Sequence, residues 1–313
     1  MSNTKRQLGR PAQDEFSTEG RTLRPFHALA CAALVAAGPT FAQDTGVRAT
    51  GGCAVVPLLP AAIPVVEVTI GGKGPYRFAI DTGAQGHGRI RAELAAELGL
   101  PEVGEVGTPA PGGTVATRPV FGAHEVSVGA VSFKNIDLVA LSDVRRPDGA
   151  WDGVLGNALI ELLPLTLDYG NARARFGGPE LHEGFPVSFD RGIPILPLDI
   201  AGRRFEVHWD SGNGAAALFL EEEAARSLQL AREPVESGRA RTSFGDLTVM
   251  EAPLAVSVTV DRTPLPVRAV SWPSPRSGGN LGSRAMAGMS VTIDRSAQLA
   301  RIERSGLPPR CPD

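Results

Sequence analysis

Several well-known catalytic signatures are missing from this sequence. It has no Gly-x-Ser-x-Gly, no His-Glu-x-x-His, no phosphate-binding loop and no paired Cys-x-x-Cys. Its five histidines show no spacing typical of metal ligands. The serine-hydrolase, zinc-peptidase and nucleotide-hydrolase signatures are therefore excluded, and neither a metal nor a cofactor is expected.

Long apolar runs are also missing, since no stretch approaches the ~20 apolar residues of a membrane-spanning helix. The compact apolar run 28–37 follows Arg21 and Arg24. Thr40-Phe41-Ala42 then places small residues where a signal peptidase reads the chain. We expect a signal peptide over residues 1–42, cleaved near Ala42, and a periplasmic or secreted protein.

Cysteine is scarce, with three residues in the chain. Cys31 falls within the predicted signal peptide, which leaves Cys53 and Cys311 near the two ends of the remaining chain. In an oxidising compartment these two are expected to form a disulfide. Closing so long a loop contributes above ~4 kcal/mol in the chain-entropy model. The alternative is a reactive thiol.

Charge of either sign is modest. The formal charge of −3 becomes −5 when residues 1–42 are removed, because five basic and three acidic residues leave with them. A mildly acidic body argues against a nucleic-acid partner. The 37 glycines and 26 prolines, which follow no regular period, indicate frequent turns and favour an all-β protein.

An internal repeat organises the sequence. A pattern that begins at Val66 returns near Leu196, and each copy has an alternating strand, a glycine turn and a second strand. The first copy ends in Asp81 and the second in Asp210. The repeat predicts two lobes, residues 43–183 and residues 184–313, each with an aspartate at the end of a strand.

The rest of each copy follows the same order. A short helical pattern follows each aspartate, at 91–100 in the first copy and 221–230 in the second. A second motif comes later in each copy, Val154-Leu155-Gly156 and Asn280-Leu281-Gly282. Leu155 lies 74 residues after Asp81, and Leu281 lies 71 residues after Asp210. Each copy then closes with a predicted hairpin, LTLDYGNARARF in the first and VTIDRSAQLARI in the second. A linker is expected near 180–186, where the strand pattern breaks.

These motifs resemble those of the pepsin-like and retropepsin-like aspartic peptidases. Their signature is Asp-Thr/Ser-Gly, followed about one lobe later by two apolar residues and a glycine. Asp81-Thr82-Gly83 with Val154-Leu155-Gly156 matches this signature. Asp210-Ser211-Gly212 with Asn280-Leu281-Gly282 also matches, although Asn280 stands where an apolar residue is usual. The resemblance covers residues 54–306 and implies an all-β, bilobal fold of two duplicated, barrel-like lobes with short surface helices.

The resemblance implies that Asp81 and Asp210 form a catalytic pair. Two carboxylates held close together cannot both ionise easily, so the pair retains one shared proton and supplies one acid and one base. Such a pair would activate water against a peptide bond, with peptides or unfolded proteins as substrates. One chain already supplies both halves, so a monomer is expected rather than a homodimer of single-lobe units.

The residues after each aspartate have implied roles as well. The resemblance gives the hydroxyls of Thr82 and Ser211 the task of bracing the two loops across the lobe interface. Gly83 and Gly212 allow a tight turn and close approach of the backbone. Ala84 stands where a hydroxyl is common, and losing that donor is expected to move activity towards less acidic pH.

Two points stay open at this stage. The glycines of Pro111-Gly112-Gly113-Thr114 are candidates for a substrate-covering flap, but an ordinary exposed turn has the same composition. The whole fold also admits a different use, as a catalytically silent periplasmic peptide-binding or scaffold protein. Retention of both Asp81 and Asp210 favours the enzyme.

Overall fold

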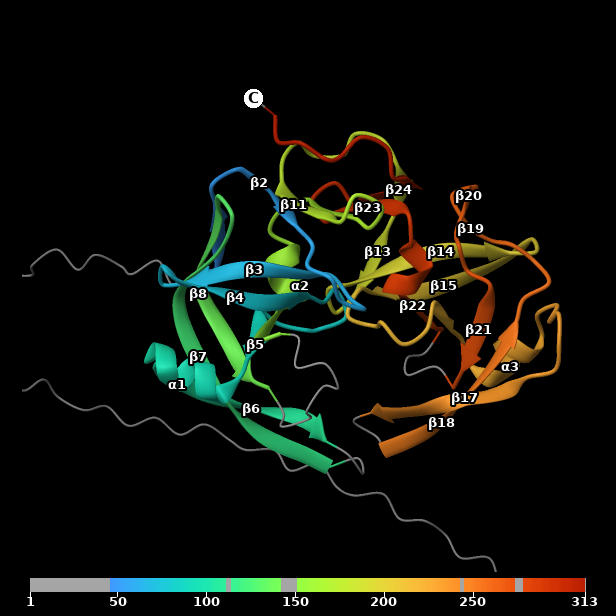
Figure 1. Ribbon diagram of the computed structural model, residues 1–313, viewed down its shortest axis with the longest axis horizontal. Coiled ribbons are helices and arrows are strands. Elements are labelled where there is room, and N and C mark those ends of the chain that lie inside the picture. The colour runs from blue at the N-terminus through green and yellow to red at the C-terminus, as the bar shows by residue number, and fades with distance from the viewer. Residues whose placement is uncertain (1–45, 111–113, 142–150, 243–244, 274–277, 313) are drawn as a thin grey trace, which may run out of the picture. The chain divides into compact units, whose positions relative to one another are not determined.

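The computed structural model describes residues 46–110, 114–141, 151–242, 245–273 and 278–312. The predicted signal peptide and the flap candidates Gly112 and Gly113 lie outside these ranges. The described residues form three β-sheets and a few short helices, shown in Figure 1. The predicted all-β class is confirmed.

The first sheet has eight strands in the order β1-β8-β5-β9-β4-β3-β7-β6. β7 also pairs with β8, so the six strands from β8 to β7 in this order close into a barrel. We call this region the first lobe. Its strands are β1 (Arg48–Thr50), β3 (Val65–Ile70), β4 (Lys73–Ile80), β5 (Gly88–Ile90), β6 (Glu102–Ala110), β7 (Thr114–Val128), β8 (Val131–Ala140) and β9 (Gly153–Leu155).

The second lobe is a ten-stranded sheet in the order β17-β18-β21-β16-β22-β15-β14-β19-β20, with β13 paired to β14. This path does not close on itself within the described residues. Its strands are β13 (Ser188–Asp190), β14 (Ile193–Ile200), β15 (Arg203–Asp210), β16 (Leu218–Phe219), β17 (Val235–Thr242), β18 (Gly245–Pro253), β19 (Val258–Val260), β20 (Thr263–Pro264), β21 (Ala269–Trp272) and β22 (Asn280–Gly282).

The repeat read from the sequence has a structural counterpart in the strand register. β4 runs parallel to β9 with Ile80 opposite Leu155, and β15 runs parallel to β22 with Trp209 opposite Leu281. In both lobes the residue before the aspartate therefore faces the middle residue of the second motif. All four of these side chains are fully buried, which fixes the register because a slip by one residue would expose them.

A six-stranded sheet joins segments from both halves of the chain, in the order β12-β24-β23-β10-β11-β2. The two predicted closing hairpins lie here side by side, because β10 pairs with β23 over Leu165↔Ile293 to Asp168↔Ser290. The strands are β2 (Cys53–Pro57), β10 (Leu165–Asp168), β11 (Arg173–Gly177), β12 (Phe185–Pro186), β23 (Met289–Asp294) and β24 (Leu299–Arg304).

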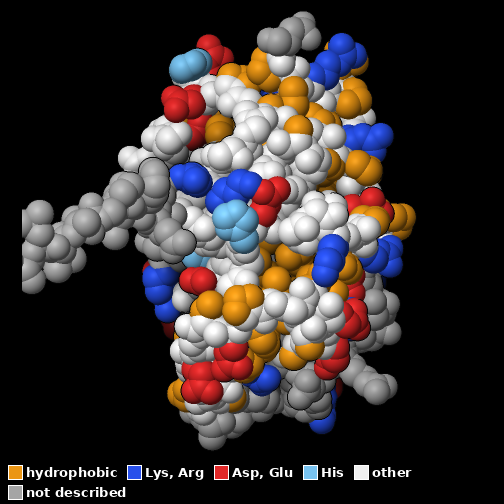
Figure 2. All heavy atoms as spheres, turned by 90° about the vertical axis from the view of Figure 1, so that its left-hand side faces the viewer, with side chains coloured by type: hydrophobic (Ala, Val, Ile, Leu, Met, Phe, Trp, Pro, Cys, Tyr) orange, Lys and Arg blue, Asp and Glu red, His pale blue; other side chains and the backbone are white. Residues whose placement is uncertain are grey.

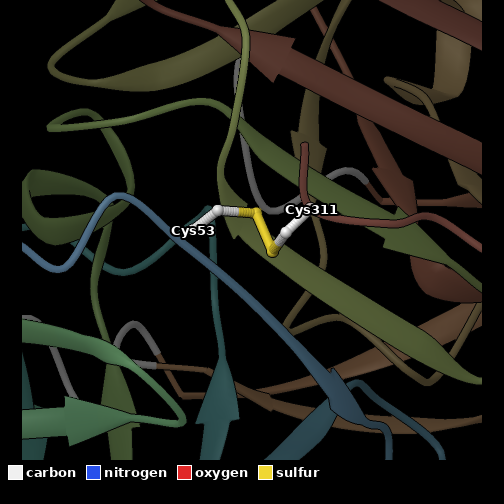
Figure 3. Close-up of a disulfide and its surroundings, with 2 residues drawn as sticks. All are labelled: Cys53 and Cys311. Carbon is white, nitrogen blue, oxygen red and sulfur yellow. A yellow bond between two sulfur atoms is a disulfide. The ribbon is translucent and has the colours of Figure 1, made fainter. Parts of the chain in front are cut away.

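The predicted disulfide is present. Cys53 on β2 bonds to Cys311 near the C-terminus, with 5.7 Å between their Cα atoms (Figure 3). β2 itself pairs with β11, so the bond ties the C-terminal segment to an edge of the joining sheet. The covalent link and the pairing of β10 with β23 thus connect the two halves at the same sheet.

Helices are few and short in the described chain. They are α1 (Ala92–Leu98), α2 (Asn157–Ile160), α3 (Glu222–Arg226) and the 3₁₀ turn η1 (Ser283–Met286). α1 and α3 fall within the two helical patterns predicted from the sequence. α1 ends at Gly99, whose φ of 69° lies in the left-handed region that glycine adopts without strain. α2 and η1 follow the second motif of each lobe.

Apolar side chains are packed inside the sheets, with Phe78 and Phe133 in the first lobe and Trp209 and Trp272 in the second. Acidic and basic side chains mingle on the face drawn in Figure 2, with apolar side chains scattered between them. In the described ranges no helix is long and apolar enough to cross a membrane.

Candidate active site

Asp81 and Asp210 occupy equivalent places in the two lobes. Asp81 follows the last residue of β4, and Asp210 is the last residue of β15. Each of these strands pairs in parallel with a short strand, β9 or β22, that is itself paired on its other side. A strand held on both edges is rigid, so the turn at its end has a fixed position. Both aspartates are partly exposed there.

The hydroxyls of Thr82 and Ser211 join the two turns in a reciprocal arrangement. Thr82 Oγ1 donates to the carbonyl of Trp209 at 2.7 Å and accepts from the N–H of Ser211 at 2.9 Å. Ser211 Oγ donates to the carbonyl of Ile80 at 2.7 Å and accepts from the N–H of Thr82 at 3.0 Å. Both side chains are buried, so these bonds satisfy main-chain groups that water does not reach.

Gly83 and Gly212 are each pressed against the carboxylate of the other turn. A Cβ atom at Gly83 would lie 2.5 Å from Cγ of Asp210, and one at Gly212 would overlap Cγ of Asp81. Neither glycine adopts a left-handed φ, so close approach is what requires them here. The N–H of Gly83 also donates to Oδ1 of Asp81 at 2.9 Å. Gly83 therefore contacts both carboxylates, which places them beside each other.

The second lobe adds a chain of amides that the sequence did not reveal. The N–H of Ala215 donates to Asn213 Oδ1 at 3.0 Å, and Asn213 Nδ2 donates to Asn280 Oδ1 at 2.7 Å. Asn280 Nδ2 then donates to Asp210 Oδ2 at 2.8 Å. In the sequence, Asn280 stands where the resemblance gives an apolar residue and Asn213 stands where it gives Ser or Thr. The contacts that these two side chains make could not be read from either departure.

A second missed group lies behind Ser211. Ser283 Oγ donates to the carbonyl of Ser211 at 2.6 Å, and the hydroxyl of Tyr169 lies 3.2 Å from Ser283 Oγ. Burial raises the pKa of the Tyr169 phenol well above its ordinary value, the bond to Ser283 lowers it, and the charge of Asp210 raises it further. Tyr169 therefore stays neutral and keeps its proton for hydrogen bonding.

His208 lies two residues before Asp210 on β15 but makes its contact elsewhere. Its Nε2 is 3.1 Å from Oδ2 of Asp190 on β13, and its buried Nδ1 has no hydrogen-bond partner among the described residues. The hydrogen bond from His208 lowers the pKa of the Asp190 carboxyl. His208 thus links two strands of the second lobe.

Each lobe also carries a long hairpin after its aspartate, visible in Figure 1 as β6–β7 and β17–β18. The flap candidates Gly112 and Gly113 belong to the connection between β6 and β7, which lies outside the described residues. The matching connection in the second lobe is 243–244, also outside them. The two hairpins therefore occur at corresponding points of the repeat.

Metal ligation finds no support in the described part of the chain, where no three His, Cys, Asp or Glu side chains are grouped closely enough to hold an ion. The site instead consists of two carboxylates, two hydroxyls, two glycines and a pair of amides. This set of groups suits proton transfer, because carboxylates accept and donate protons while the surrounding donors set their charge.

Comparison with known proteins covers the first lobe. Residues 66–159 match the family model described as "Aspartyl protease", a range that includes the Asp81 turn, the β6–β7 hairpin and the Val154-Leu155-Gly156 motif. No curated protein matches the chain. The match over residues 66–159 supports an aspartic peptidase superfamily assignment.

Proposed function

We propose that the protein is an aspartic endopeptidase that cleaves unfolded proteins, with Asp81 and Asp210 as its acid-base pair. The observation that carries this proposal is the position of Gly83, which hydrogen-bonds one carboxylate and packs against the other. Two carboxylates that share one glycine are close enough to interact directly. The family match for the first lobe supports the same class of enzyme.

The chemistry follows from the repulsion between two neighbouring negative charges. One carboxyl of the pair keeps its proton at a pH where an isolated aspartate would have lost it. The ionised carboxylate then draws a proton from a bound water, whose oxygen attacks the carbonyl carbon of the peptide. The protonated carboxyl donates to the carbonyl oxygen.

The intermediate is a tetrahedral diol that is not bonded to the enzyme. Its breakdown requires a proton on the amide nitrogen, which the carboxyl that took the proton from water can return. As the C–N bond breaks, the other carboxylate takes a proton from one hydroxyl of the diol. The products are a carboxylic acid and an amine, and the pair again holds one proton. No covalent adduct and no additional reactant enter the cycle.

Hydrolysis of denatured casein between about pH 3 and about pH 8 tests the proposal. We expect activity that a statine-type inhibitor blocks. Asp81→Asn and Asp210→Asn should each reduce kcat/KM by at least ~10²-fold, because each removes one partner of the proton transfer. Both variants keep the shape of the side chain and one acceptor oxygen, so a folded but inactive variant points to chemistry.

A wild-type protein that is folded yet inert over this range would contradict the proposal. In that case binding of unfolded casein, measured directly, would favour a peptide-binding protein with the same fold. Activity retained in either asparagine variant would instead show that the carboxylate pair is not the catalytic group.

We also propose that the protein acts in the periplasm or outside the cell. The Cys53–Cys311 disulfide supports this, because such bonds persist in oxidising compartments. The predicted signal peptide, residues 1–42, agrees with it. N-terminal sequencing of the exported protein tests the proposal. An N-terminus near Gln43 is expected, and retention of the uncleaved chain in the cytoplasm would contradict it.

A further inference from the structure

We infer that the protein cleaves between two unlike residues, an apolar residue held against the first lobe and a residue that donates a hydrogen bond to the second lobe. The inference rests on the proposed function and deepens it, since it names the class of peptide bond that the carboxylate pair receives. The side chains around the two aspartate turns carry it, because they differ in kind between the lobes.

The strand that leads to Asp81 has one face in the main core and one face outside it. Phe78 and Ile80 are buried in the main core, while Ala79 between them belongs to a separate apolar cluster. Because side chains alternate along a strand, Asp81 lies on the face of Ala79. The separate cluster therefore lies on the side of the strand that carries the carboxylate.

We call this separate cluster, with the side chains packed on it, the apolar patch. Ile63 is one of its partly exposed members, and it also reaches the other turn, because a Cβ at Gly214 would lie 3.0 Å from Ile63 Cγ2. The patch thus brings apolar surface up to the carboxylate pair. Its buried members are Val65, Ala79, Ala84, Trp151 and Val154, and its partly exposed members are Leu59, Ile63 and Leu141.

The second lobe has polar side chains at the corresponding positions. His208 lies two residues before Asp210, where the first lobe has Ala79. Across the parallel ladder His208 is opposite Asn280, where the first lobe has a valine. Asn213 stands where the first lobe has an alanine. Each of these positions is apolar beside one acid and polar beside the other.

Together with Asp190 these side chains form what we call the polar patch, Asp190, His208, Asn213 and Asn280. His208 Nε2 lies 3.1 Å from Asp190 Oδ2, and Arg191 Nε lies 3.5 Å from the other oxygen of that carboxylate. Asp190 and Asn213 are partly exposed, and each of their oxygens has two lone pairs. The polar patch can therefore accept further hydrogen bonds.

The ring of His208 adds an acceptor that has no donor. A carboxylate only accepts, so Nε2 carries the ring proton and Nδ1 of the neutral ring is an acceptor. Nδ1 is buried and has no hydrogen-bond partner among the described residues. Packing an apolar side chain over this region would exclude water and leave the acceptor unsatisfied, which costs free energy. A donor from the substrate would satisfy it.

The position of the pair decides how a peptide meets the two patches. Thr82 and Ser211 bond the two turns directly to each other, so the carboxylates stand where the lobes join. Successive side chains of an extended peptide point to opposite sides. The residues before and after a bond held between the carboxylates therefore face different lobes, one at the apolar patch and one at the polar patch.

Cleavage-site profiling tests the inference. The wild-type protein digests a mixture of denatured proteins, and mass spectrometry of the products identifies the residues on both sides of each cleaved bond. We expect apolar residues at one position and Ser, Thr, Asn, Gln or Lys at the other. In matched peptides each preferred class should raise kcat/KM by about tenfold over the other class. The same preference at both positions, or none, overturns the inference.

Binding to the Asp81→Asn variant gives the same comparison without turnover. Three peptides differ only in their two central residues, which are leucine–leucine, leucine–glutamine or glutamine–leucine. One mixed peptide should bind at least ~5-fold more tightly than leucine–leucine. If the wild type is inert and a mixed peptide is still preferred, the proposed function alone fails. Equal binding of all three peptides overturns the inference.

Variants of the two patches should change the preferences separately. His208→Ala/Asn213→Ala gives the second lobe the side chains of the first, so both positions should now prefer apolar residues. His208→Ala alone is the milder form, for use if the double variant does not fold. Ile63→Asn should weaken only the apolar preference, and His124→Ala, at an exposed site on β7, should change neither. A folded His208→Ala/Asn213→Ala with the wild-type profile overturns the inference.

Discussion

In the first lobe β7 runs without a break over Thr114–Val128 and pairs with β3 and β8, which closes a barrel. In the second lobe the matching stretch is divided between β18 and β19, and the following stretch between β20 and β21. Pro253 ends β18, and Pro264 ends β20. β18 pairs with β21 and β19 pairs with β20, and no pairing closes a second barrel within the described residues.

The turns that carry Asp81 and Asp210 are alike, although only the first lobe closes into a barrel among the described residues. The bonds of Thr82 to the second lobe and those of Ser211 to the first are equivalent in partners and nearly equal in length. The geometry of the carboxylate pair therefore depends on the two strands that precede the aspartates and on the hydrogen bonds between the two turns. It does not require two complete barrels.

The lobes differ again in what surrounds the acids. The second lobe provides amides near Asp210, where the first lobe has Ala84 and Val154. We call the two aspartate turns, with their strands and the bonds between them, the frame of the site. The frame is symmetric, so equivalent substitutions in the two turns should have equal effects. The side chains around the two acids differ, so substitutions there should have unequal effects.

The largest effect is expected from Gly83→Ala and Gly212→Ala. Each added Cβ would displace the carboxylate of the opposite turn, so kcat/KM for casein should fall by ~10²-fold or more. If the frame is symmetric, the two losses should be alike. Gly306→Ala is the matched control, because a Cβ there meets open space. Full activity in either active-site variant would show that the carboxylates tolerate displacement.

A smaller effect is expected from Thr82→Val and Ser211→Ala. Each removes a hydroxyl that serves one buried N–H and one buried carbonyl, so the free energy of unfolding should fall by about 2–3 kcal/mol. Denaturant unfolding measures it. Thr50→Val, whose hydroxyl bond is exposed, should change stability by less than ~0.5 kcal/mol. Clearly unequal losses of unfolding free energy in Thr82→Val and Ser211→Ala would show that the two turns are not equivalent.

The smallest effect is expected from Ala84→Ser, which returns a hydroxyl to the first lobe. A donor near Asp81 favours its ionised form and lowers its pKa, so the acid limb of the pH–rate profile should move to lower pH by less than about one unit. Ala92→Ser, on the exposed side of α1, should leave the profile unchanged. A shift to higher pH in Ala84→Ser would contradict the sign of this argument.

Much of the fold was predictable because its signals are local. Alternating apolar residues before Asp81 and Asp210 indicated the strands, and the matched spacing of the later motifs indicated the repeat. The pairing of Cys53 with Cys311 needed only the count of cysteines and an oxidising compartment. The boundary between the lobes near residue 183 stays a prediction, since the joining sheet takes strands from both sides of it.

The amide chain could not be predicted in the same way. Asn213 and Asn280 are far apart in the sequence, and each alone has the composition of a turn or a strand irregularity. Their contact depends on the parallel register of β15 with β22, which puts Asn280 opposite His208 and beside Asp210. A side chain that seemed to weaken the motif proved to be a partner of the acid.

The two aspartate turns, the repeat and the disulfide partners could be read from the sequence, because each is encoded in short patterns or in residue counts. The pairing of β10 with β23, the closure of one lobe alone among the described residues and the bond from Asn280 to Asp210 could be seen only in the folded chain. Those outcomes depend on contacts between segments separated by most of a lobe or more. Such contacts arise from packing and register, which no local pattern contains.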